Sequence, residues 1–592
     1  MFYIFVETQT TQSKRKNRGA FPMWVFLRSL TTLPLSLRRI FLFALLVFLI
    51  TSFMFLLRWN ERFLVEVPRE GGTLSEGIIG RPRFINPVIA KSDADRDMVA
   101  LIYSGLLKAT PDGALVPDLA RDYTVSPDGL VYTFTLKDEL VWHDGEPVTA
   151  KDVLFTIEKA RDPSLAIKSP RRASWEGVLI ETPDQKTVVF RIKQPYAPFL
   201  ENATMGILPE HIWKNVPNEE FDVTYHNIEP IGSGPYRMKN IAEDKTRGLP
   251  QYYDLVAFKR YALGEPHITN FRIAFFGNNK ELAEAYNDRK VDQMHTLEPA
   301  LAKELTHGGA TIVEVPLPRV FAAYFNQNQQ TMFADKGVRQ ALALAVDKER
   351  IVTDILLGYA RVIDGPLPSV TIGTTTESAG TTDERRTKAR TLLEKSGWVS
   401  NAAGVYEKTD KKSKTVTPFE FSLSIPDVPE LKAVAEHIKS DWEKLGAVVT
   451  LKVFDPSTFV AEVLSPRKYD VIFYGQVIGR TPDPFAYWHA SQRNAPGLNI
   501  ALYANKNADK LLENIRKESN PTLRADMLEK FAEEVRADVP AVFVYSPDFL
   551  YATSKDVRGI TIGPIIVESE RFLDVQNWYV KSERVWKWLA PS

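Results

Sequence analysis

The chain has 592 residues, and its 74 basic and 74 acidic side chains give a formal net charge of zero. It therefore lacks the excess positive charge by which nucleic-acid-binding proteins attach to phosphates. It also contains no cysteine, which excludes disulfides, thiolate nucleophiles, zinc–thiolate sites and iron–sulfur clusters. Because this length exceeds what one hydrophobic core usually supports, we expect two or three substructures.

An uncharged apolar run, IFLFALLVFLITSFMFLL, occupies residues 40–57. At about 1.5 Å per residue a helix of this length reaches roughly 27 Å, close to the thickness of a bilayer core. The residues before it are strongly basic, with Glu7 as their single acidic residue. The basic residues are Lys14, Arg15, Lys16, Arg18, Arg28, Arg38 and Arg39. By the positive-inside rule we predict a cytoplasmic arm at 1–39, a transmembrane anchor at 40–57 and a linker at 58–70.

Two alternatives to an anchor remain, a buried core helix and a cleavable signal peptide. The sequence RWNERFLVEVPRE, which follows the apolar run, lacks the small-residue motif at which signal peptides are cleaved. We therefore expect the protein to be retained in the plasma membrane by one helix, with everything after residue 58 on the extracytoplasmic side.

The extracytoplasmic part alternates between segments with strand and helix patterns. TVVFRI at 187–192 and DVIF within 468–476 are typical of buried strands, and 335–357 has helical spacing of its apolar residues. Residues 430–454 predict a helix that stops at Gly446 and is followed by a strand. This alternation indicates an α/β fold.

Two further stretches are rich in turn-forming or polar residues. Residues 363–382 predict an exposed loop, and the polar, Lys-rich residues 401–418 predict a loop or a hairpin.

One cluster of chemically capable residues, VWHDGEPVTAKDV, starts at Val141. His143 and three acidic residues lie within ten positions, but no second histidine lies near enough to complete a zinc site. Asp144 and Gly145 suit a turn, and Thr149 with Asp152 suits a helix N-cap before an apolar helical pattern. We interpret the cluster as a strand, a turn and a capped helix.

Motifs for catalysis are missing from the sequence. The eight histidines form no metal-binding pair, and there is no nucleophile elbow, Walker A loop or dinucleotide fingerprint. In IGSGPYRM, residues 231–238, the glycines suit a sharp turn before a strand that starts at Tyr236. The sequence thus predicts no catalytic residue, no metal site and no cofactor.

Several stretches together resemble the peptide-binding, family 5 extracellular solute-binding proteins of ABC importers, from about residue 71 onward. The most specific is residues 101–153, which contain W-x-D-G-x-P-x-T-A-x-D-V, a structural signature of this family's smaller lobe. The others are GGTLSEGI (71–78), FINPVI (84–89), ILPEHIW (207–213), PIGSGPYRM (230–238), FADKGVRQALALAVDKERIV (333–352) and GLNIALYANKNADKLL (497–512).

The resemblance implies a two-lobed, periplasmic-binding-protein-like α/β fold of type II with an extra small domain, placed behind the transmembrane helix. Its hinged lobes would enclose a ligand and offer it to a membrane permease. The expected divisions are lobe I at 71–105, 200–312 and 539–592, a small inserted domain at 106–199, and lobe II at 313–538.

One position departs from the family. Its peptide binders hold the ligand's ammonium group with an aspartate about three residues before an acidic-Pro pair, commonly after a tryptophan. Here the pair is Asp483-Pro484, the aspartate position holds Arg480, and Val477 replaces the tryptophan. A guanidinium cannot anchor an ammonium group but pairs with a carboxylate or phosphate. Arg480 therefore faces a ligand, pairs internally with Asp483, or points to solvent.

The other candidate ligand contacts follow from the same resemblance. AAYFNQN, residues 322–328, resembles a strand that pairs with an extended ligand by β-augmentation, with its polar residues on one face. An aromatic residue after the Asp483 loop could form a pocket wall. The full set of candidates is Arg480, Asp483, Gln476, Tyr324, Asn326, Asn328, Trp488 and Asn499.

The leading functional hypothesis is a membrane-anchored, monomeric receptor that delivers a peptide or another small solute to an ABC permease. A sensory or chaperone-like ectodomain of the same fold is the alternative, and a surface hydrolase is a weaker one. The fold alone does not decide between them.

Overall fold

The computed structural model describes residues 34–243, 249–295, 298–368 and 380–589, and it divides into two compact units. The first unit combines the N-terminal residues up to Pro68 with Ser582–Ser592, and the second spans Arg69–Lys581. The predicted cytoplasmic arm lies largely outside the described residues, as does part of the loop predicted at 363–382.

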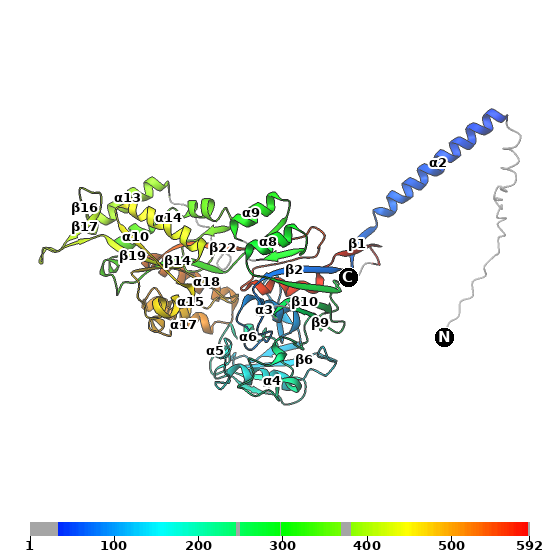
Figure 1. Ribbon diagram of the computed structural model, residues 1–592, viewed down its shortest axis with the longest axis horizontal. Coiled ribbons are helices and arrows are strands. Elements are labelled where there is room, and N and C mark those ends of the chain that lie inside the picture. Colours follow the sequence, from blue (N-terminus) through cyan, green and yellow to red (C-terminus); the bar gives the residue numbers. More distant parts are fainter. Residues whose placement is uncertain (1–33, 244–248, 296–297, 369–379, 590–592) are drawn as a thin grey trace, which may run out of the picture. The chain divides into compact units, whose positions relative to one another are not determined.

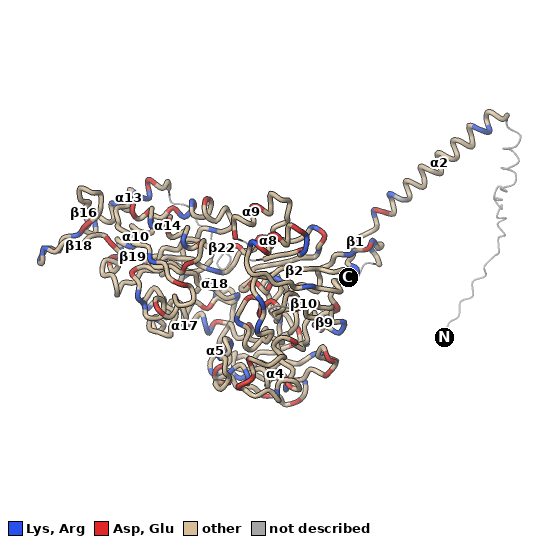
Figure 2. Tube along the Cα trace, viewed as in Figure 1, with Lys and Arg blue, Asp and Glu red and all other residues tan. Residues whose placement is uncertain are grey.

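The first unit contains the predicted apolar helix as α2 (Leu35–Glu61). Among the described residues α2 is the helix long and apolar enough to cross a membrane, and its side chains do not pack inside the protein. Figure 2 shows charged residues near both ends of α2 and none through its middle. Within the predicted linker at 58–70, α2 continues to Glu61 and strand β1 (Leu64–Arg69) pairs with β23 (Lys581–Trp586).

The second unit is organised around one mixed sheet in which β22 is central (Figure 1). The strands of this sheet come from distant parts of the sequence, so their order in space differs from their order along the chain. In spatial order, the main path through the described residues is β20 (Val448–Phe454), β19 (Glu420–Pro426), β21 (Val471–Val477), β14 (Arg319–Phe325), β22 (Ala541–Thr553), β12 (Gln293–His295), β2 (Thr73–Ile79), β11 (Asn270–Phe276), β10 (Pro250–Ala257) and β9 (Tyr236–Glu243).

Helices cover both faces of the half-sheet from β20 to β14, which we call lobe II. Ala323 and Phe325 of β14 face one core, formed with α10 (Lys336–Ala345), α13 (Thr382–Lys395) and α14 (Pro429–Leu445). Ala322 and Tyr324 face the other core, formed with α17 (Lys506–Lys517) and α18 (Pro521–Asp538). The strict alternation along β14 therefore places apolar side chains on both faces, as a buried strand requires.

The other half-sheet, from β12 to β9, forms lobe I. One face packs against α3 (Asp93–Ile102) and the 3-10 segment η6 (Glu568–Asn577). The other packs against α8 (Asn279–Asn287) and α9 (Pro299–His307).

A separate four-stranded sheet lies within the range predicted for the small domain. It has the order β5 (Ala120–Val125), β6 (Val131–Leu136), β8 (Thr187–Arg191) and β7 (Leu179–Glu181). The helix predicted after the Asp144-Gly145 turn is α4 (Ala150–Arg161), which lies between β6 and β7 in the chain. Its capping box is confirmed, because Asp152 accepts hydrogen bonds from the backbone N–H and the hydroxyl of Thr149.

The chain passes between the lobes along β22 and along the connection from β13 (Thr311–Pro316) to β14. Residues 541–545 of β22 pair with β14 in lobe II, whereas its last three residues pair with β12 in lobe I. A boundary at residue 539 therefore places too much of β22 in lobe I. A strand shared in this way can act as a hinge, because a small change at its centre reorients both halves.

Other local predictions are confirmed. Gly446 takes a left-handed conformation (φ 113°) at the end of α14, and β20 follows it. The polar stretch at 401–418 forms a small antiparallel sheet with β17 (Tyr406–Thr409) and β18 (Val416–Pro418).

The glycines of IGSGPYRM have a different role from the one predicted. Neither Gly232 nor Gly234 adopts a positive φ, but a Cβ on Gly232 would lie 2.0 Å from the Ile102 carbonyl oxygen. The Gly234 N–H donates to that same oxygen at 2.8 Å. Close approach to the end of α3, and not a sharp turn, requires these glycines.

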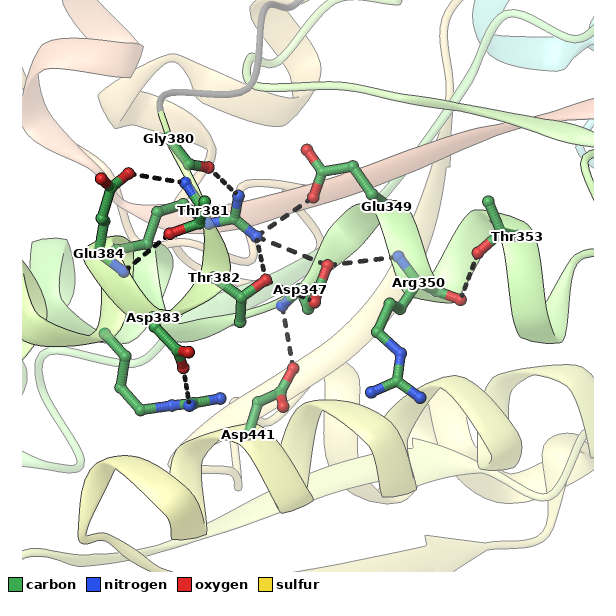
Figure 3. A network of polar contacts seen from close by, with 12 residues as sticks. Asp347, Glu349, Arg350, Thr353, Gly380, Thr381, Thr382, Asp383, Glu384 and Asp441 are labelled. Carbon is green, nitrogen blue, oxygen red and sulfur yellow. Dashed lines mark hydrogen bonds and ion pairs between the residues drawn. The ribbon is translucent and has the colours of Figure 1, made fainter.

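A polar network in lobe II holds the start of α13 against the segment after α10 and against α14 (Figure 3). Thr381 caps α13 in a capping box with Glu384, and Thr382 donates to Asp347 at 2.8 Å. The Asp347 N–H donates in turn to Asp441 of α14 at 2.9 Å. These contacts link α13, α14 and the segment after α10 through satisfied polar groups.

A buried ionic cluster ties lobe I together around Arg571 of η6. Its guanidinium donates to Asp97 of α3 at 2.7 and 2.8 Å and to Glu76 of β2 at 2.7 Å. His295 of β12 lies 3.1 Å from Asp97 and 3.2 Å from Glu568. All but the partly accessible Glu568 are essentially inaccessible, so each charge depends on its partners.

This cluster predicts a loss of stability at alkaline pH. Burial and the Arg571 charge oppose protonation, yet Asp97 and Glu568 raise the pKa of His295 to about 9. A histidine whose pKa is raised stabilises the fold fully below its ordinary pKa of 6.5, and this contribution is lost as pH rises through 9. We expect the free energy of unfolding to fall by about 3 kcal/mol across that window.

Denaturant unfolding at pH 6 and pH 9.5 measures the effect. His295→Gln should lower stability at pH 6 and abolish most of the fall, whereas His307→Gln, at an exposed position of α9, should behave like the parent. An unchanged pH dependence in His295→Gln would contradict the assignment.

Candidate functional site

The described residues contain a pocket of about 480 Å³ on the face of lobe I that meets lobe II. Most of its wall comes from α3, the residues after it, η6 and the loops at 170–171 and 204–206, and Arg480 reaches it from lobe II. This volume lies in the range of roughly 300–1,000 Å³ that is typical of small-molecule sites.

Arg480 closes this pocket through an ion pair between the lobes. It lies in the loop after β21, and its Nη2 donates to Glu570 of η6 at 2.8 Å. Its side chain is 11% exposed. Burial raises the pKa of Glu570, which the charge of Arg480 partly offsets. Arg480 therefore neither points to solvent nor forms an ion pair with Asp483.

Asp483 lies in the same loop as Arg480 and forms a second set of contacts, which reaches Arg516 in lobe II and Tyr196 outside it. It accepts a bidentate pair from Arg516 of α17, at 2.8 to 3.1 Å, and a hydrogen bond from the Tyr196 hydroxyl at 3.3 Å. The Ala197 N–H donates to the Arg516 carbonyl at 2.9 Å. Burial and the Asp483 charge raise the pKa of Tyr196 to about 12. The loop is thus held against lobe I and the small sheet, as in a closed form.

The inner end of the pocket carries polar groups without protein partners. Within the described residues the buried Tyr103 hydroxyl has no hydrogen-bond partner, and the Ser104 hydroxyl and one oxygen of the adjacent Asp118 complete no hydrogen bond of standard geometry. Burial raises the pKa of Asp118 to about 6 and lowers that of Lys108, which donates to Gln576 at 3.0 Å. Unpaired buried groups of this kind are costly unless a ligand or water satisfies them.

The structure does not bring the other predicted residues to this pocket. Tyr324 and Trp488 are fully buried and pack against each other in a lobe II core, with ring centroids 6.2 Å apart. The Asn499 amide donates to the carbonyls of Trp488, His489 and Tyr503, so it holds the loop after α16 (Phe485–Trp488). Gln476 is buried within β21. The structure gives Tyr324, Trp488 and Asn499 internal packing and hydrogen-bonding roles.

The predicted β-augmentation at 322–328 is wrong for this structure, because β14 is paired on both sides and has no free edge. The strand also ends at Phe325, before Asn326 and Asn328. Asn326 is buried and accepts from the Asn328 N–H at 3.1 Å, while Asn328 is exposed. The two asparagines therefore form a turn and share no strand face with Tyr324.

Sequence reasoning missed the pocket residues Tyr103, Asp118, Arg171 and Glu570. The first two lie inside the stretch of clearest family resemblance, residues 101–153, but before its W-x-D-G-x-P-x-T-A-x-D-V element. Glu570 has no local signal, because its partner Arg480 lies ninety residues away.

Comparison with known proteins places this geometry in context. The family description "Bacterial extracellular solute-binding proteins, family 5 Middle" matches residues 114–498. The oligopeptide-binding protein AppA of Bacillus subtilis (strain 168) is 26% identical over 539 residues, covering 87% of this chain and 92% of the relative. The probable D,D-dipeptide-binding periplasmic protein DdpA of Escherichia coli (strain K12) is 25% identical, covering 83% and 92%.

Two solved structures share the fold. The ABC transporter substrate-binding protein CtaP of Listeria monocytogenes is 25% identical with a TM-score of 0.72, covering 87% of this chain and all of that one. NikZ of Campylobacter jejuni, in complex with Ni(L-His), is 26% identical with a TM-score of 0.67, covering 86% and 99%. The ligands that such neighbours bind are therefore chemically diverse.

The Arg480–Glu570 pair predicts a measurable effect on closure. When either charge is removed, the remaining charge is largely buried and has lost its partner. Arg480→Ala should therefore shift the ligand-free protein toward an open form. Because the chain lacks cysteine, Ser413→Cys and Gln185→Cys provide one fluorophore site in lobe II and one in the small sheet. Energy transfer between them should fall in Arg480→Ala and in Glu570→Ala.

A double-mutant cycle on these two residues should give a coupling free energy of about 1–3 kcal/mol for closure. Arg272→Ala, which breaks an exposed pair with Asp254 within lobe I, is the matched control and should leave energy transfer unchanged. Equal transfer in all variants would show that the pair does not contribute to closure.

Proposed function

The chain belongs to the bacterial extracellular solute-binding proteins of family 5, and we propose that it captures a peptide or a related small solute between its lobes and delivers it to an ABC permease. The observation that carries this proposal is the pocket itself. It is walled by lobe I, closed by Arg480 of lobe II, and lined with polar and charged residues.

Ligand capture by such a protein requires that the closed form gain contacts that the open form lacks. The lining residues of lobe I, among them Tyr103 and Arg171, supply these contacts, and Arg480 supplies one from lobe II. A solute that bridges them stabilises closure by the free energy of its differential contacts, and the closed shape is what a permease would recognise.

The remaining sequence-derived ligand contacts enter the proposal in two groups. Arg480 contacts the ligand directly, either together with Glu570 or in exchange for it. Asp483 acts indirectly, because its pair with Arg516 holds the loop that presents Arg480. We propose no direct contact for Tyr324, Trp488 or Asn499, since each is buried among protein atoms.

We further propose that α2 anchors the protein in the plasma membrane, with the second unit on the extracytoplasmic side and the chain acting as a monomer. The uncharged centre of α2, its exposed apolar side chains and the basic residues before it support this arrangement. An extracytoplasmic location for the large unit agrees with the family.

A sensory or chaperone-like role uses the same pocket without a permease, and it differs in its partner. Crosslinking of the closed protein to a permease subunit supports transport, whereas capture of the solute without any permease partner supports the alternative. A hydrolase would need a nucleophile or base at the pocket, and the only carboxylates among its described lining residues are Asp118 and Glu570.

The anchor predicts a defined protease pattern. Protease added to spheroplasts should digest the second unit and leave a protected fragment that contains residues 1–57, because these residues lie inside or within the membrane. Mass spectrometry of the membrane fraction identifies that fragment. A mature protein that begins near residue 60 and is released into the medium would contradict the anchor.

A further inference from the structure

Basic side chains outnumber acidic ones among the described residues that line the pocket. Lys91 and Arg96 lie at the start of α3, and Arg171 lies in the loop before α5 (Arg172–Trp175). Arg96 pairs with the exposed Asp93 at 2.6 Å and donates to the Lys91 carbonyl. Its Nε is buried without a hydrogen-bond partner in the part of the chain that the structure describes.

Arg171 has neither an ion pair nor a guanidinium hydrogen bond among the described residues. It lines the pocket and keeps accessible surface. Desolvation and the neighbouring Arg96 charge lower its pKa, and the charge of Glu570 partly offsets them. Two guanidinium groups that repel each other at the wall of one pocket form a site to which an anion is attracted.

The other charges around the pocket are matched. Arg480 pairs with Glu570, and Lys108 lies near Asp118 and Asp574. The lining residues thus carry more positive than negative charge, and the Arg96 and Arg171 guanidinium groups are close enough to repel each other.

The size of the pocket limits the ligand. A cavity of about 150 Å³ holds benzene, so the 480 Å³ found here accommodates a solute of roughly 20 non-hydrogen atoms. That is the size of a di- or tripeptide, and it is too small for a long peptide to be enclosed entirely.

We propose that the pocket selects compact anionic solutes of di- or tripeptide size and holds a carboxylate of the solute between Arg96 and Arg171. This inference rests on the proposed function. The rest of the solute then lies against Tyr103 and Asp118, which line the same pocket.

The test uses the full-length chain in detergent and a mixture of synthetic tripeptides, each present as the free acid and as the C-terminal amide. Peptides retained by the immobilised protein are released and quantified by mass spectrometry. We expect the free acids to be enriched over their amides by about tenfold or more, because one charge-assisted contact is worth at least that factor.

Arg96→Gln and Arg171→Gln should each abolish most of this enrichment, while Arg171→Lys, which keeps the charge, should retain much of it. Arg172→Gln is the matched control in the same loop, since Arg172 does not line the pocket. Enrichment that persists in both glutamine variants overturns the proposal. Retention of acids and amides alike overturns it but leaves solute capture standing, and retention of no peptide contradicts both.

A second inference concerns the first unit and comes from different residues. The end of α2 continues into a row of aromatic side chains, Phe55, Trp59 and Phe63, with successive ring centroids 5.5 and 6.1 Å apart. Trp59 and Phe63 are 53% and 42% exposed. Both follow Arg58, at the point where the apolar run of α2 ends.

The C-terminal strand returns to this place. The Lys587 N–H donates to the Phe63 carbonyl at 2.8 Å, directly after β23 pairs with β1. Trp586, Trp588 and Leu589 are 44%, 73% and 61% exposed, and the two indoles contact each other at 6.0 Å. The same two segments carry Arg58, Arg62, Arg584 and Lys587 together with Glu61, Glu66 and Glu583.

Exposed tryptophans beside the end of a membrane-spanning helix are typical of the interface between lipid headgroups and acyl chains. We infer that Trp586, Trp588 and Leu589 insert into the outer bilayer interface next to Trp59 and Phe63, so that the strand pair β1–β23 rests on the membrane.

Single-cysteine variants of this cysteine-free chain test the contact. Leu589→Cys, labelled with an environment-sensitive fluorophore in phosphatidylcholine–phosphatidylglycerol vesicles, should lose most of its emission to nitroxides placed near the lipid headgroup. Ser413→Cys, in an exposed hairpin of lobe II, should not. Ile50→Cys, within α2, should respond to nitroxides deep in the acyl region.

Quenching at position 50 without quenching at 589 overturns the interface contact and leaves the anchor standing. Absence of quenching at both positions contradicts both. In a Trp586→Ala/Trp588→Ala background the quenching at 589 should weaken, because the tryptophans no longer hold the strand in the interface. If the label were merely close to the membrane, these substitutions would leave the quenching unchanged.

Discussion

The buried pairing of Arg571 with Glu76 and Asp97 is the interaction on which the rest of lobe I depends. It joins a residue near the end of the chain to β2 and α3, which lie almost five hundred positions earlier. None of the three charges is accessible, so each would be costly without the others. Because Ser569, Glu570 and Phe572 flank Arg571 and line the pocket, the same pairing fixes one wall of the ligand site.

The charges at the mouth of the pocket have a different character from those in the core. Arg480 and Glu570 remain partly accessible and come from opposite lobes, so they can separate into water at modest cost when the lobes open. A pair of this kind favours closure without locking it. A solute that offers a better partner to Arg480 than Glu570 does would convert a loosely closed form into a stable one.

Sequence reasoning succeeded where the determining interactions are local. The Thr149–Asp152 cap and the left-handed Gly446 follow from spacings of a few residues, and both are confirmed. The family resemblance also singled out Arg480. It could not supply Glu570, because pairing across a hinge depends on how distant segments meet. The error at Asn326 arose for the same reason, since only the neighbouring strands reveal that β14 has no free edge.

Membership of the family does not by itself determine the ligand, as relatives associated with oligopeptides, a D,D-dipeptide and a nickel–histidine complex show. The groups that differ between such pockets are those that a ligand must satisfy. Here the guanidinium groups of Arg480, Arg96 and Arg171 belong to residues that line the pocket. Closing the lobes around an empty pocket leaves these charges poorly solvated, whereas closing them around an anion removes that cost. Under the proposed selection of anions, the charge of the solute determines whether closure is favourable, and the shape of the shared fold determines where it occurs.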